Sequence, residues 1–519
     1  MEGEGREVGI IGAGISGLLA CKYVLSKGYH PVVFEAESSI GGVWLKTFET
    51  TKIQTAKSLY QFSDFPWPPP DLPTEQYPTQ DQVLHYIQSY AHHFDLESHI
   101  RFNTKVVTLT YNQQQQEEQT PSWSHPSSSS KGKGKWNLTL LHHQEPKVFQ
   151  ADFVIVCVGR FGGVPNIPKF PSGRDPNVFQ GKVIHSMDYA SMDYPDAKQF
   201  LRGKKITVVG FQKSALDIAM ESAAVNGLEN PCTVLYRTKH WNVPDHQPWG
   251  VPLANLYLNR FSELMVHKPG EGFLLSILAS LLSPLRWASS KFVETYISHK
   301  HRLAKFGMIP KHSFLQELSS CLISTVPDGF YDKVEQGSII LQEAPTFHFF
   351  QNGILINGET NITTLETDLV ILATGFDGVS KLRGLFESRI FQDLLTEPHN
   401  SLPLYRECIH PRIPQLAVIG FSESVTNLFT SEIRCRWVAE LLDGTFMLPS
   451  IQGMEKEIDK WNDYKKLYSG KYYNRSCIGA LHIWYNDQLC KDMGWNPRRK
   501  KGIIAELFQP YGPMDYTNP

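Results

Sequence analysis

The chain lacks a strong charge of either sign. Its 50 lysine and arginine residues nearly balance 52 aspartate and glutamate residues, which gives a formal net charge of −2. A surface that binds nucleic acid needs a clear excess of basic side chains. We therefore expect no nucleic-acid partner, and we interpret the densest basic run, at residues 498–501, as a solvated patch.

Cysteine is scarce, and no two cysteines form a Cys-x-x-Cys motif. That motif carries the redox-active dithiol of disulfide reductases, so the sequence excludes this class of enzyme. No metal-ligand motif is found either, and we expect no bound metal. The cysteines are Cys21, Cys157, Cys232, Cys321, Cys408, Cys435, Cys477 and Cys490.

Long hydrophobic runs are also missing. The most apolar stretch, residues 273–282, is far shorter than the roughly 20 residues that cross a bilayer, so no transmembrane anchor is expected. We predict a buried or substrate-lining helix there, with docking on a membrane surface as the less favoured alternative. Because no charged and apolar signal regions precede the first strand, a cytoplasmic location is predicted.

A complete Gly-x-Gly-x-x-Gly turn stands near the N-terminus, at Gly12, Gly14 and Gly17. The apolar run 8–11 before it is typical of a strand, and residues 18–25 after it have helical spacing. In such a turn the first glycine allows the bend, the second lets a pyrophosphate approach, and the third lets helix and strand pack closely. The helix N-terminus then faces the phosphates, which predicts a dinucleotide site.

Glu35 identifies the nucleotide of this first site. It closes a predicted strand at residues 30–34, about 20 residues beyond the turn, where an acid binds the ribose. A carboxylate there accepts bonds from a free 2′-hydroxyl and repels a 2′-phosphate, so FAD or NAD is favoured over NADP. Gly42 would let the backbone run against the ligand and Trp44 offers a flat face; the alternative is a glycine turn with a packed tryptophan.

A second, altered turn follows the strand-like run 206–209. It begins at Gly210, has Gln212 where a second glycine is usual, and continues through Lys213, Ser214 and Ala215 into a predicted helix. The glutamine side chain must leave room for a pyrophosphate. We expect Lys213 to compensate with positive charge.

Arg237 ends the next predicted strand, in the place that Glu35 has in the first site. Arginine pairs bidentately with phosphate, so NADPH is the expected ligand, the alternative being a solvated strand end. Two sites with ribose-binding residues of opposite charge fit one division of labour. FAD stays bound and carries out redox chemistry, while NADPH delivers electrons.

Between the two sites lies Phe179-x-Gly181-x-x-x-His185-x-x-x-Tyr189. It resembles the fingerprint of the flavin-containing monooxygenases at every fixed position, and the resemblance spans nearly the whole chain. Family chemistry implies that NADPH reduces FAD, that the flavin forms a C4a-hydroperoxide with O2, and that this species oxygenates a soft nucleophile. In the family the fingerprint is structural or gating, so His185 is given no acid–base role.

The resemblance also implies one catalytic side chain and a substrate class. Gln54 stands where many animal and fungal members have an asparagine, and it is our candidate for supporting the reacting oxygen. The runs 236–241 and 489–496 resemble the plant branch that N-hydroxylates pipecolic acid. An amine or cyclic amino acid is thus the expected small-molecule substrate, with S-oxygenation or 2-oxo acid decarboxylation as alternatives. A flavin oxidase or reductase and, because of Gln212, a non-enzymatic NADPH sensor are the other hypotheses.

At 519 residues the chain is too long for one ordinary core. The predicted fold class is α/β, with two nested Rossmann-like domains and the NADP domain inserted into the FAD domain. We place the FAD domain at 1–165 and 330–519 and the NADP domain at 166–329. A disordered insertion is predicted at 112–135, and Gly420, after a strand, is expected near the flavin. The oligomeric state is left open.

Overall fold

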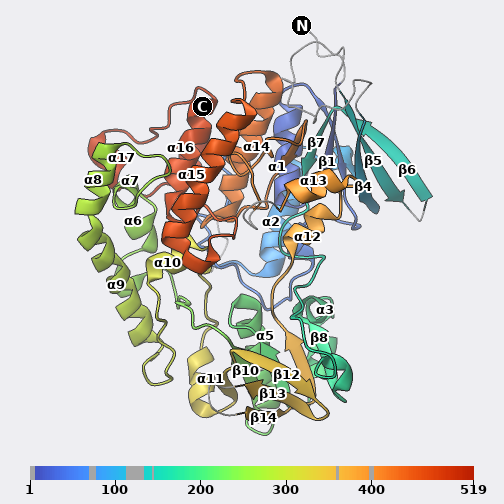
Figure 1. Cartoon of the computed structure of the whole chain (residues 1–519), viewed down its shortest axis with the longest axis vertical. Helices are drawn as coiled ribbons and strands as arrows, with labels where there is room; N and C mark the ends of the chain where they lie inside the picture. The colour runs from blue at the N-terminus through green and yellow to red at the C-terminus, as the bar shows by residue number, and fades with distance from the viewer. Residues whose placement is uncertain are drawn as a thin grey trace.

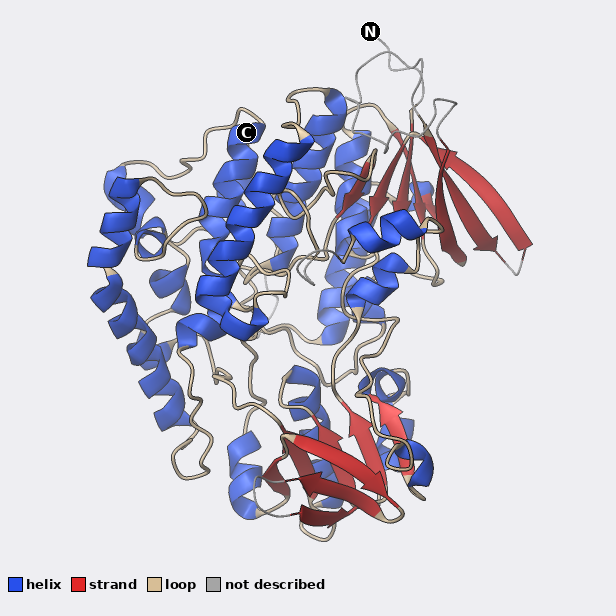
Figure 2. Ribbon diagram, viewed as in Figure 1, coloured by secondary structure: helices blue, strands red, loops and turns tan. Residues whose placement is uncertain are grey.

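The computed structural model describes residues 6–68, 77–112, 134–142, 145–357, 362–396 and 402–518. Nearly all of the insertion predicted at 112–135 lies outside these residues. Two sheets, each covered by further elements, occupy different parts of the molecule (Figures 1 and 2). Helices from the middle and the C-terminal end of the chain form the remaining flank.

The first sheet is parallel and runs in the order β16-β7-β1-β2-β3. Strands β7 and β16 are entirely apolar because both faces of the sheet are covered. Phe153 and Ile155 of β7 face the core beneath α1 (Ile15–Leu25) and α14 (Asn427–Asp443), whereas Val154 and Val156 face the opposite core. The strands are β1 (Glu7–Ile11), β2 (His30–Phe34), β3 (Ile100–Arg101), β7 (Phe153–Val156) and β16 (Leu416–Val418).

An antiparallel sheet covers the second face of the first sheet. Its strands are β4 (Thr104–Asn112), β5 (Lys135–His142) and β6 (Glu145–Ala151), paired in that order. Trp136 and Leu138 of β5 are fully buried in the core that this sheet shares with β7. The first sheet is therefore held between helices and a second layer of strands.

The second sheet is also parallel and runs in the order β11-β10-β9-β15-β8. α5 (Lys213–Asn226) packs on one face and a small antiparallel sheet on the other. The parallel strands are β8 (Lys182–His185), β9 (Ile206–Val209), β10 (Cys232–Tyr236), β11 (Ile339–Glu343) and β15 (Leu369–Leu372). The antiparallel strands are β12 (Thr346–Phe350), β13 (Gly353–Asn357) and β14 (Ile362–Glu366).

The connectivity confirms the predicted nesting. The chain leaves the first sheet after β7, builds the second sheet, and returns to the first sheet at β16. One boundary moves, because β11 and β15 pair with β10 and β9 although both follow residue 329. The predicted end of the inserted unit at 329 is thus too early: its last sheet strand is β15.

The remaining helices lie beside these sheets or in the flank formed by the middle and the C-terminal end of the chain (Figure 1). In chain order they are α2 (Gln80–His93), α3 (Ser186–Ala190), α4 (Tyr194–Leu201), α6 (Leu253–Tyr257), α7 (Arg260–Leu264), α8 (Phe273–Leu281), α9 (Ser283–Lys300), α10 (Phe314–Ser319), α11 (Phe330–Gln336), α12 (Gly378–Arg383), α13 (Arg389–Leu394), α15 (Ile451–Ser469), α16 (His482–Asp492) and α17 (Ile503–Phe508).

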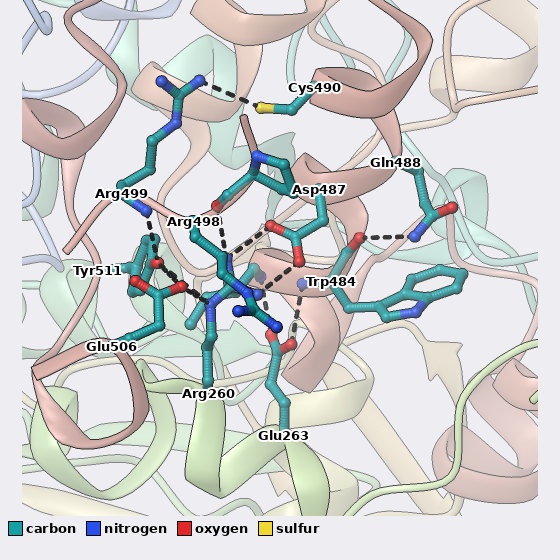
Figure 3. A network of polar contacts seen from close by, with 12 residues as sticks. Arg260, Glu263, Trp484, Asp487, Gln488, Cys490, Arg498, Arg499, Glu506 and Tyr511 are labelled. Atoms are coloured by element: carbon teal, nitrogen blue, oxygen red, sulfur yellow. Dashed lines mark hydrogen bonds and ion pairs between the residues drawn. The ribbon is translucent and has the colours of Figure 1, made fainter. Parts of the chain in front are cut away.

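A buried polar network joins α7 to the C-terminal helices α16 and α17 (Figure 3). Arg260 donates two hydrogen bonds to Asp487, at 2.5 and 2.9 Å, and a third to Glu506 at 2.5 Å. On the same helix, the Glu263 carboxylate accepts from the backbone N–H of Trp484 at 2.9 Å, in the first turn of α16. The network fastens the C-terminal region to the middle of the chain.

Helix α8 corrects the prediction of a buried or substrate-lining helix at 273–282. Phe273 is 79% exposed, Leu274 80% and Leu281 71%, and none of these side chains lines the cavity described below. Within the described ranges, no single helix is long and apolar enough to cross a membrane. Helices α8 and α9 meet the limits of length and apolar composition only when taken together, across a 47° bend.

A disulfide that the sequence did not predict links Cys321 to Cys477. It joins the segment after α10 to the segment after α15, which are far apart in the sequence. The other six cysteines, all within the described ranges, are free and buried.

Candidate active site

A single continuous cavity of about 2990 Å³ joins the carboxyl ends of the two parallel sheets. Ligands of open α/β sheets bind at these strand ends, and the volume is several times that of an ordinary small-molecule pocket. Most of the site residues predicted from the sequence line it: Gly12, Gly14, Glu35, Gly42, Trp44, Gln54, Gly210, Lys213, Ser214 and Arg237. Both predicted nucleotide sites therefore open into one space.

The first glycine turn has the shape that a pyrophosphate requires. Gly12 has a φ of +102°, which favours glycine, and Gly14 faces Gly42 so closely that an added methyl group would lie 3.4 Å from its Cα. Gly17 lies behind the cavity wall, where a methyl group would be 1.8 Å from the Gly12 carbonyl oxygen. Its role is the close packing of α1 on β1.

Glu35 is held in place by a backbone N–H of the first glycine turn. The carboxylate accepts a hydrogen bond from the Ala13 backbone N–H at 2.6 Å and another from that of Glu37 at 2.9 Å, and the residue is only 7% exposed. Each oxygen keeps a lone pair that a ribose hydroxyl can use. Trp44 also lines the cavity and donates from Nε1 to the Tyr60 hydroxyl at 2.9 Å, which holds its ring in position.

Gly420, which is expected near the flavin, lies tightly against α1. A methyl group there would lie 2.2 Å from the Ser16 hydroxyl oxygen, and both residues line the cavity. The bare backbone of Gly12, Gly14, Gly42 and Gly420 forms a cradle that larger residues would fill. This cradle fits FAD.

The second turn shows why glutamine is tolerated in it. Gly210 has a φ of +137° and its missing Cβ would lie 2.5 Å from the Ala373 carbonyl oxygen, so glycine is required there. Gln212 instead has ordinary extended backbone, with φ −116°, as the N-cap of α5. Ala215 is fully buried behind the turn, at the third glycine position, where alanine is accepted.

Lys213 does not carry the free positive charge that the sequence suggested. Its ammonium donates to Asp217 at 2.5 Å, and the second Asp217 oxygen accepts from the Thr51 hydroxyl at 3.2 Å. The ion pair is mostly buried, so Asp217 already balances the charge of Lys213. Arg237, by contrast, is exposed to the cavity at the end of β10, beside Lys239, which pairs with Glu343 at 3.4 Å.

The fingerprint histidine, His185, links the end of β8 to the segment that follows β15. His185 Nε2 donates to the Gly375 carbonyl oxygen at 3.0 Å, and its Nδ1 accepts from the Met187 backbone N–H at 3.1 Å. Burial lowers the pKa of His185, in agreement with a neutral ring that uses both nitrogens. These contacts are structural, as the fingerprint predicted.

Gln54 lies on the cavity wall with its amide oriented. Its Oε1 accepts a hydrogen bond from the Thr325 backbone N–H at 3.2 Å. The Nε2 group donates no hydrogen bond within the described part of the chain. Gln54 therefore lies on the cavity wall, and one end of its amide is held by the backbone.

A charged cluster in the wall went unnoticed in the sequence. Arg160 follows β7, Glu423 follows β16, and Arg475 precedes the disulfide cysteine Cys477; all three charged residues line the cavity. The only signal in the sequence was position. Arg160 directly follows Gly159, Glu423 stands three residues after Gly420, and each of these glycines closes a strand-like run.

His240, His312 and Glu317 form the one group in the described ranges that has a metal-like donor set. His240 Nδ1 donates to the Glu317 carboxylate at 2.7 Å, and His312 Nε2 bonds to its other oxygen. Burial opposes ionisation of Glu317, but these two hydrogen bonds lower its pKa below the ordinary value. The contacts account for the group without an ion.

Comparison with known proteins agrees with this geometry. The flavin-binding monooxygenase-like family model matches residues 5–505. A probable flavin-containing monooxygenase 1 from Arabidopsis thaliana is 40% identical over 98% of this chain and 96% of its own length. A putative flavin-containing monooxygenase 2 from the same plant is 37% identical over 94% and 97%.

Solved structures share the fold. An oxidized steroid monooxygenase bound to NADP has a TM-score of 0.65 at 19% identity, covering 94% of this chain and 98% of that one. An S-allyl-L-cysteine S-oxygenase from Allium sativum has a TM-score of 0.59 at 15% identity, covering 96% and 90%. The chain belongs to the flavin-containing monooxygenase family, and is an NADPH-dependent flavin monooxygenase with FAD and NADPH as its cofactors.

Proposed function

We propose that this monooxygenase oxygenates the nitrogen of an amine, and that its substrate is a cyclic amino acid of the pipecolic acid type. For a secondary amine the balanced reaction is amine + O2 + NADPH + H⁺ → N-hydroxy amine + NADP⁺ + H2O, in which the N–H bond becomes N–OH. One oxygen atom enters the substrate and the other leaves as water, with NADPH supplying two electrons. Bound FAD supplies the redox and oxygen chemistry.

One observation supports the two-cofactor part of the proposal: a single cavity joins the two predicted nucleotide sites. In it the Glu35 carboxylate would bind a ribose hydroxyl of FAD, and Arg237 would bind the 2′-phosphate of NADPH. The choice of nitrogen is supported by a relative, the dimethylaniline monooxygenase [N-oxide-forming] 2 of Pan troglodytes. It is 25% identical over 95% of this chain and 83% of its own length.

The chain's own contribution is to orient the reactants and exclude water. Gln54, with its Oε1 held by the Thr325 N–H, would direct its amide N–H toward the reacting oxygen. No side chain is required as a nucleophile. Loss of that donor is expected to uncouple the reaction, so that NADPH is consumed without oxygenation of the substrate.

The test uses the purified, FAD-loaded protein with NADPH and isotopically labelled dioxygen. Pipecolic acid, proline, primary amines, sulfides and 2-oxo acids are supplied separately, and products are identified by mass. A hydroxylamine that carries one labelled oxygen, formed in step with NADPH oxidation, is the expected result. Oxygenation of sulfides alone, or decarboxylation of 2-oxo acids alone, would overturn the nitrogen assignment.

Gln54→Ala and Gln54→Asn form a matched pair in the same assay. We expect Gln54→Ala to release more hydrogen peroxide per NADPH than the parent enzyme, while Gln54→Asn keeps an amide and loses less coupling. Equal coupling in all three proteins would remove Gln54 from the proposed site.

A further inference from the structure

Two guanidinium groups in the cavity wall converge on one carboxylate oxygen. Arg160 Nη1 lies 3.2 Å from Glu423 Oε1, and Arg475 Nη2 donates to the same oxygen at 2.7 Å. The side chains of Arg160, Arg475 and Glu423 are 17%, 26% and 10% exposed. At this point the wall carries two positive charges and one negative charge.

Arg160 leaves most of its donors unused. Its guanidinium carries five N–H groups, but within the described ranges it donates no hydrogen bond that meets geometric criteria, and Nη1 is buried without one. The ring of Phe421 lies 5.4 Å from the guanidinium carbon and covers one face of it. Buried donors are normally satisfied. Arg160 Nη1 has only the ion pair with Glu423, on an oxygen that it shares with Arg475, so the guanidinium can still bind a further acceptor.

The second arginine is held by backbone pairing. The Glu423 N–H donates to the Ser476 carbonyl at 2.7 Å, and the Ile478 N–H donates to the Glu423 carbonyl at 3.0 Å. The Cys321–Cys477 disulfide anchors the same segment to the segment after α10. Arg475 is thus placed on a fixed segment beside Glu423.

A nearby acid does not cancel the excess charge at the cavity surface. Glu407 acts electrostatically on Arg160, but it also acts on the buried cations Arg434 and Lys465 and does not line the cavity. The unbalanced positive charge therefore faces the ligand space. A carboxylate can bind two guanidinium groups through its two oxygens.

We propose that Arg160 and Arg475 form a carboxylate-binding subsite that orients the substrate by its acid group. This assignment rests on the proposed oxygenation of an amino acid and adds the residues that select an acid over a neutral amine. The same anion chemistry could serve a phosphate of NADPH, and the test separates these two sources. Binding is expected to discriminate acid from ester by about 10- to 100-fold, as for charge-assisted hydrogen bonds.

The experiment compares two acid and ester pairs on the FAD-loaded protein: pipecolic acid with its methyl ester, and methylthioacetic acid with its methyl ester. Equilibrium binding by calorimetry and kcat/KM are both measured, in the parent protein, Arg160→Gln and Arg475→Gln. We expect the acid-to-ester ratio to fall by about 10- to 100-fold in both variants while the KM for NADPH stays unchanged. Arg302→Gln removes an arginine from an exposed ion cluster outside the cavity and is the control.

For Glu423→Gln we expect a change in acid binding opposite to that in the arginine variants. A purely structural network would not produce this opposite change. Removing the shared carboxylate frees both guanidinium groups, so acid binding should tighten by about tenfold. Weaker acid binding in Glu423→Gln, like that in the arginine variants, would overturn the subsite, as would equal binding of acid and ester by the parent protein in both pairs. A higher KM for NADPH with an unchanged acid-to-ester ratio would assign the site to the nucleotide instead.

The two pairs also separate this proposal from the proposed function. If only the sulfur compounds are oxygenated but the acid is still preferred through Arg160 and Arg475, the nitrogen assignment fails and the subsite stands. If both amines are oxygenated without regard to the acid group, the function stands and the subsite fails. Arg160→Lys keeps the charge and is expected to recover part of the acid preference, which excludes misfolding as the cause of the loss.

Discussion

Gly17 packs against Gly12 without room for a side chain: a methyl group on Gly17 would lie 1.8 Å from the Gly12 carbonyl oxygen. This contact sets the distance between α1 and the cofactor turn. We expect Gly17→Ala to cost about 3 kcal/mol in the free energy of unfolding and to lower the FAD content of the purified protein. Flavin absorbance per mole of protein and thermal unfolding are the measurements.

Gly272→Ala is the matched control, because Gly272 has an ordinary φ of −77° and an added Cβ there meets no neighbour within 4 Å. We expect it to keep the parent flavin content. The same flavin content in the Gly17 and Gly272 variants would contradict the packing argument.

Arg237 should distinguish NADPH from NADH. We expect Arg237→Ala to raise the KM for NADPH by about 10- to 100-fold and to leave the KM for NADH almost unchanged, because only NADPH carries the 2′-phosphate. Lys239→Ala is the control, since Lys239 already pairs with Glu343. Steady-state kinetics with both nucleotides decide the point, and equal losses for both would remove this role.

Local patterns in the sequence were sufficient to predict the two nucleotide turns. Gly12, Gly14 and Gly210 occur between short apolar strands and helical runs, and this order of strand, glycine turn and helix is visible in the sequence. The fingerprint also predicts a structural or gating role for His185, which the hydrogen bond to the Gly375 carbonyl supports without testing. The nested α/β architecture follows from the order of these units.

Features that depend on long-range packing could not be predicted. Nothing near Arg160 in the sequence points to Arg475, which lies more than 300 residues away. The Lys213–Asp217 pair is different, because it is an i,i+4 contact that the spacing of the predicted helix could have indicated. The end of the inserted unit was misplaced because β15 joins the second sheet through pairing with β9. Helix α8 was misjudged because apolar composition predicts burial, whereas Phe273 and Leu274 are exposed.

Arg260 should be important for stability. It is the shared donor for Asp487 and Glu506, so Arg260→Gln would leave these two mostly buried carboxylates without their cation. We expect a loss of about 3–5 kcal/mol in the free energy of unfolding. Urea unfolding of the FAD-loaded protein measures it, with Arg302→Gln, in an exposed ion cluster, as the control that should lose less than about 1 kcal/mol.

The burial of His410 predicts that the folded protein loses stability at acid pH. The ring is 4% exposed, its Nε2 donates to the Leu394 carbonyl at 3.0 Å, and its Nδ1 accepts from the Arg412 N–H at 3.1 Å. Burial lowers its pKa from 6.5 to about 4. Between these pH values the unfolded chain binds a proton that the folded protein does not, so stability falls as the pH drops from 6.5 to 4.

The maximum contribution of His410 is about 3 kcal/mol, from the size of its pKa shift. We expect His410→Gln to flatten the acid side of the stability profile, measured by urea unfolding at several pH values. His92→Gln, which alters an exposed histidine of α2, should leave the profile unchanged. Identical acid slopes for the parent protein and His410→Gln would exclude this group as the cause.

The disulfide between Cys321 and Cys477 predicts a definite thiol count. The unfolded protein should titrate six free thiols without a reductant and all eight cysteines with one. We expect replacement of both cysteines by serine to lower the free energy of unfolding by about 4 kcal/mol, since the bond closes a long loop. Eight titrated thiols without a reductant would contradict the bond. The cytoplasmic location predicted from the sequence stays a prediction.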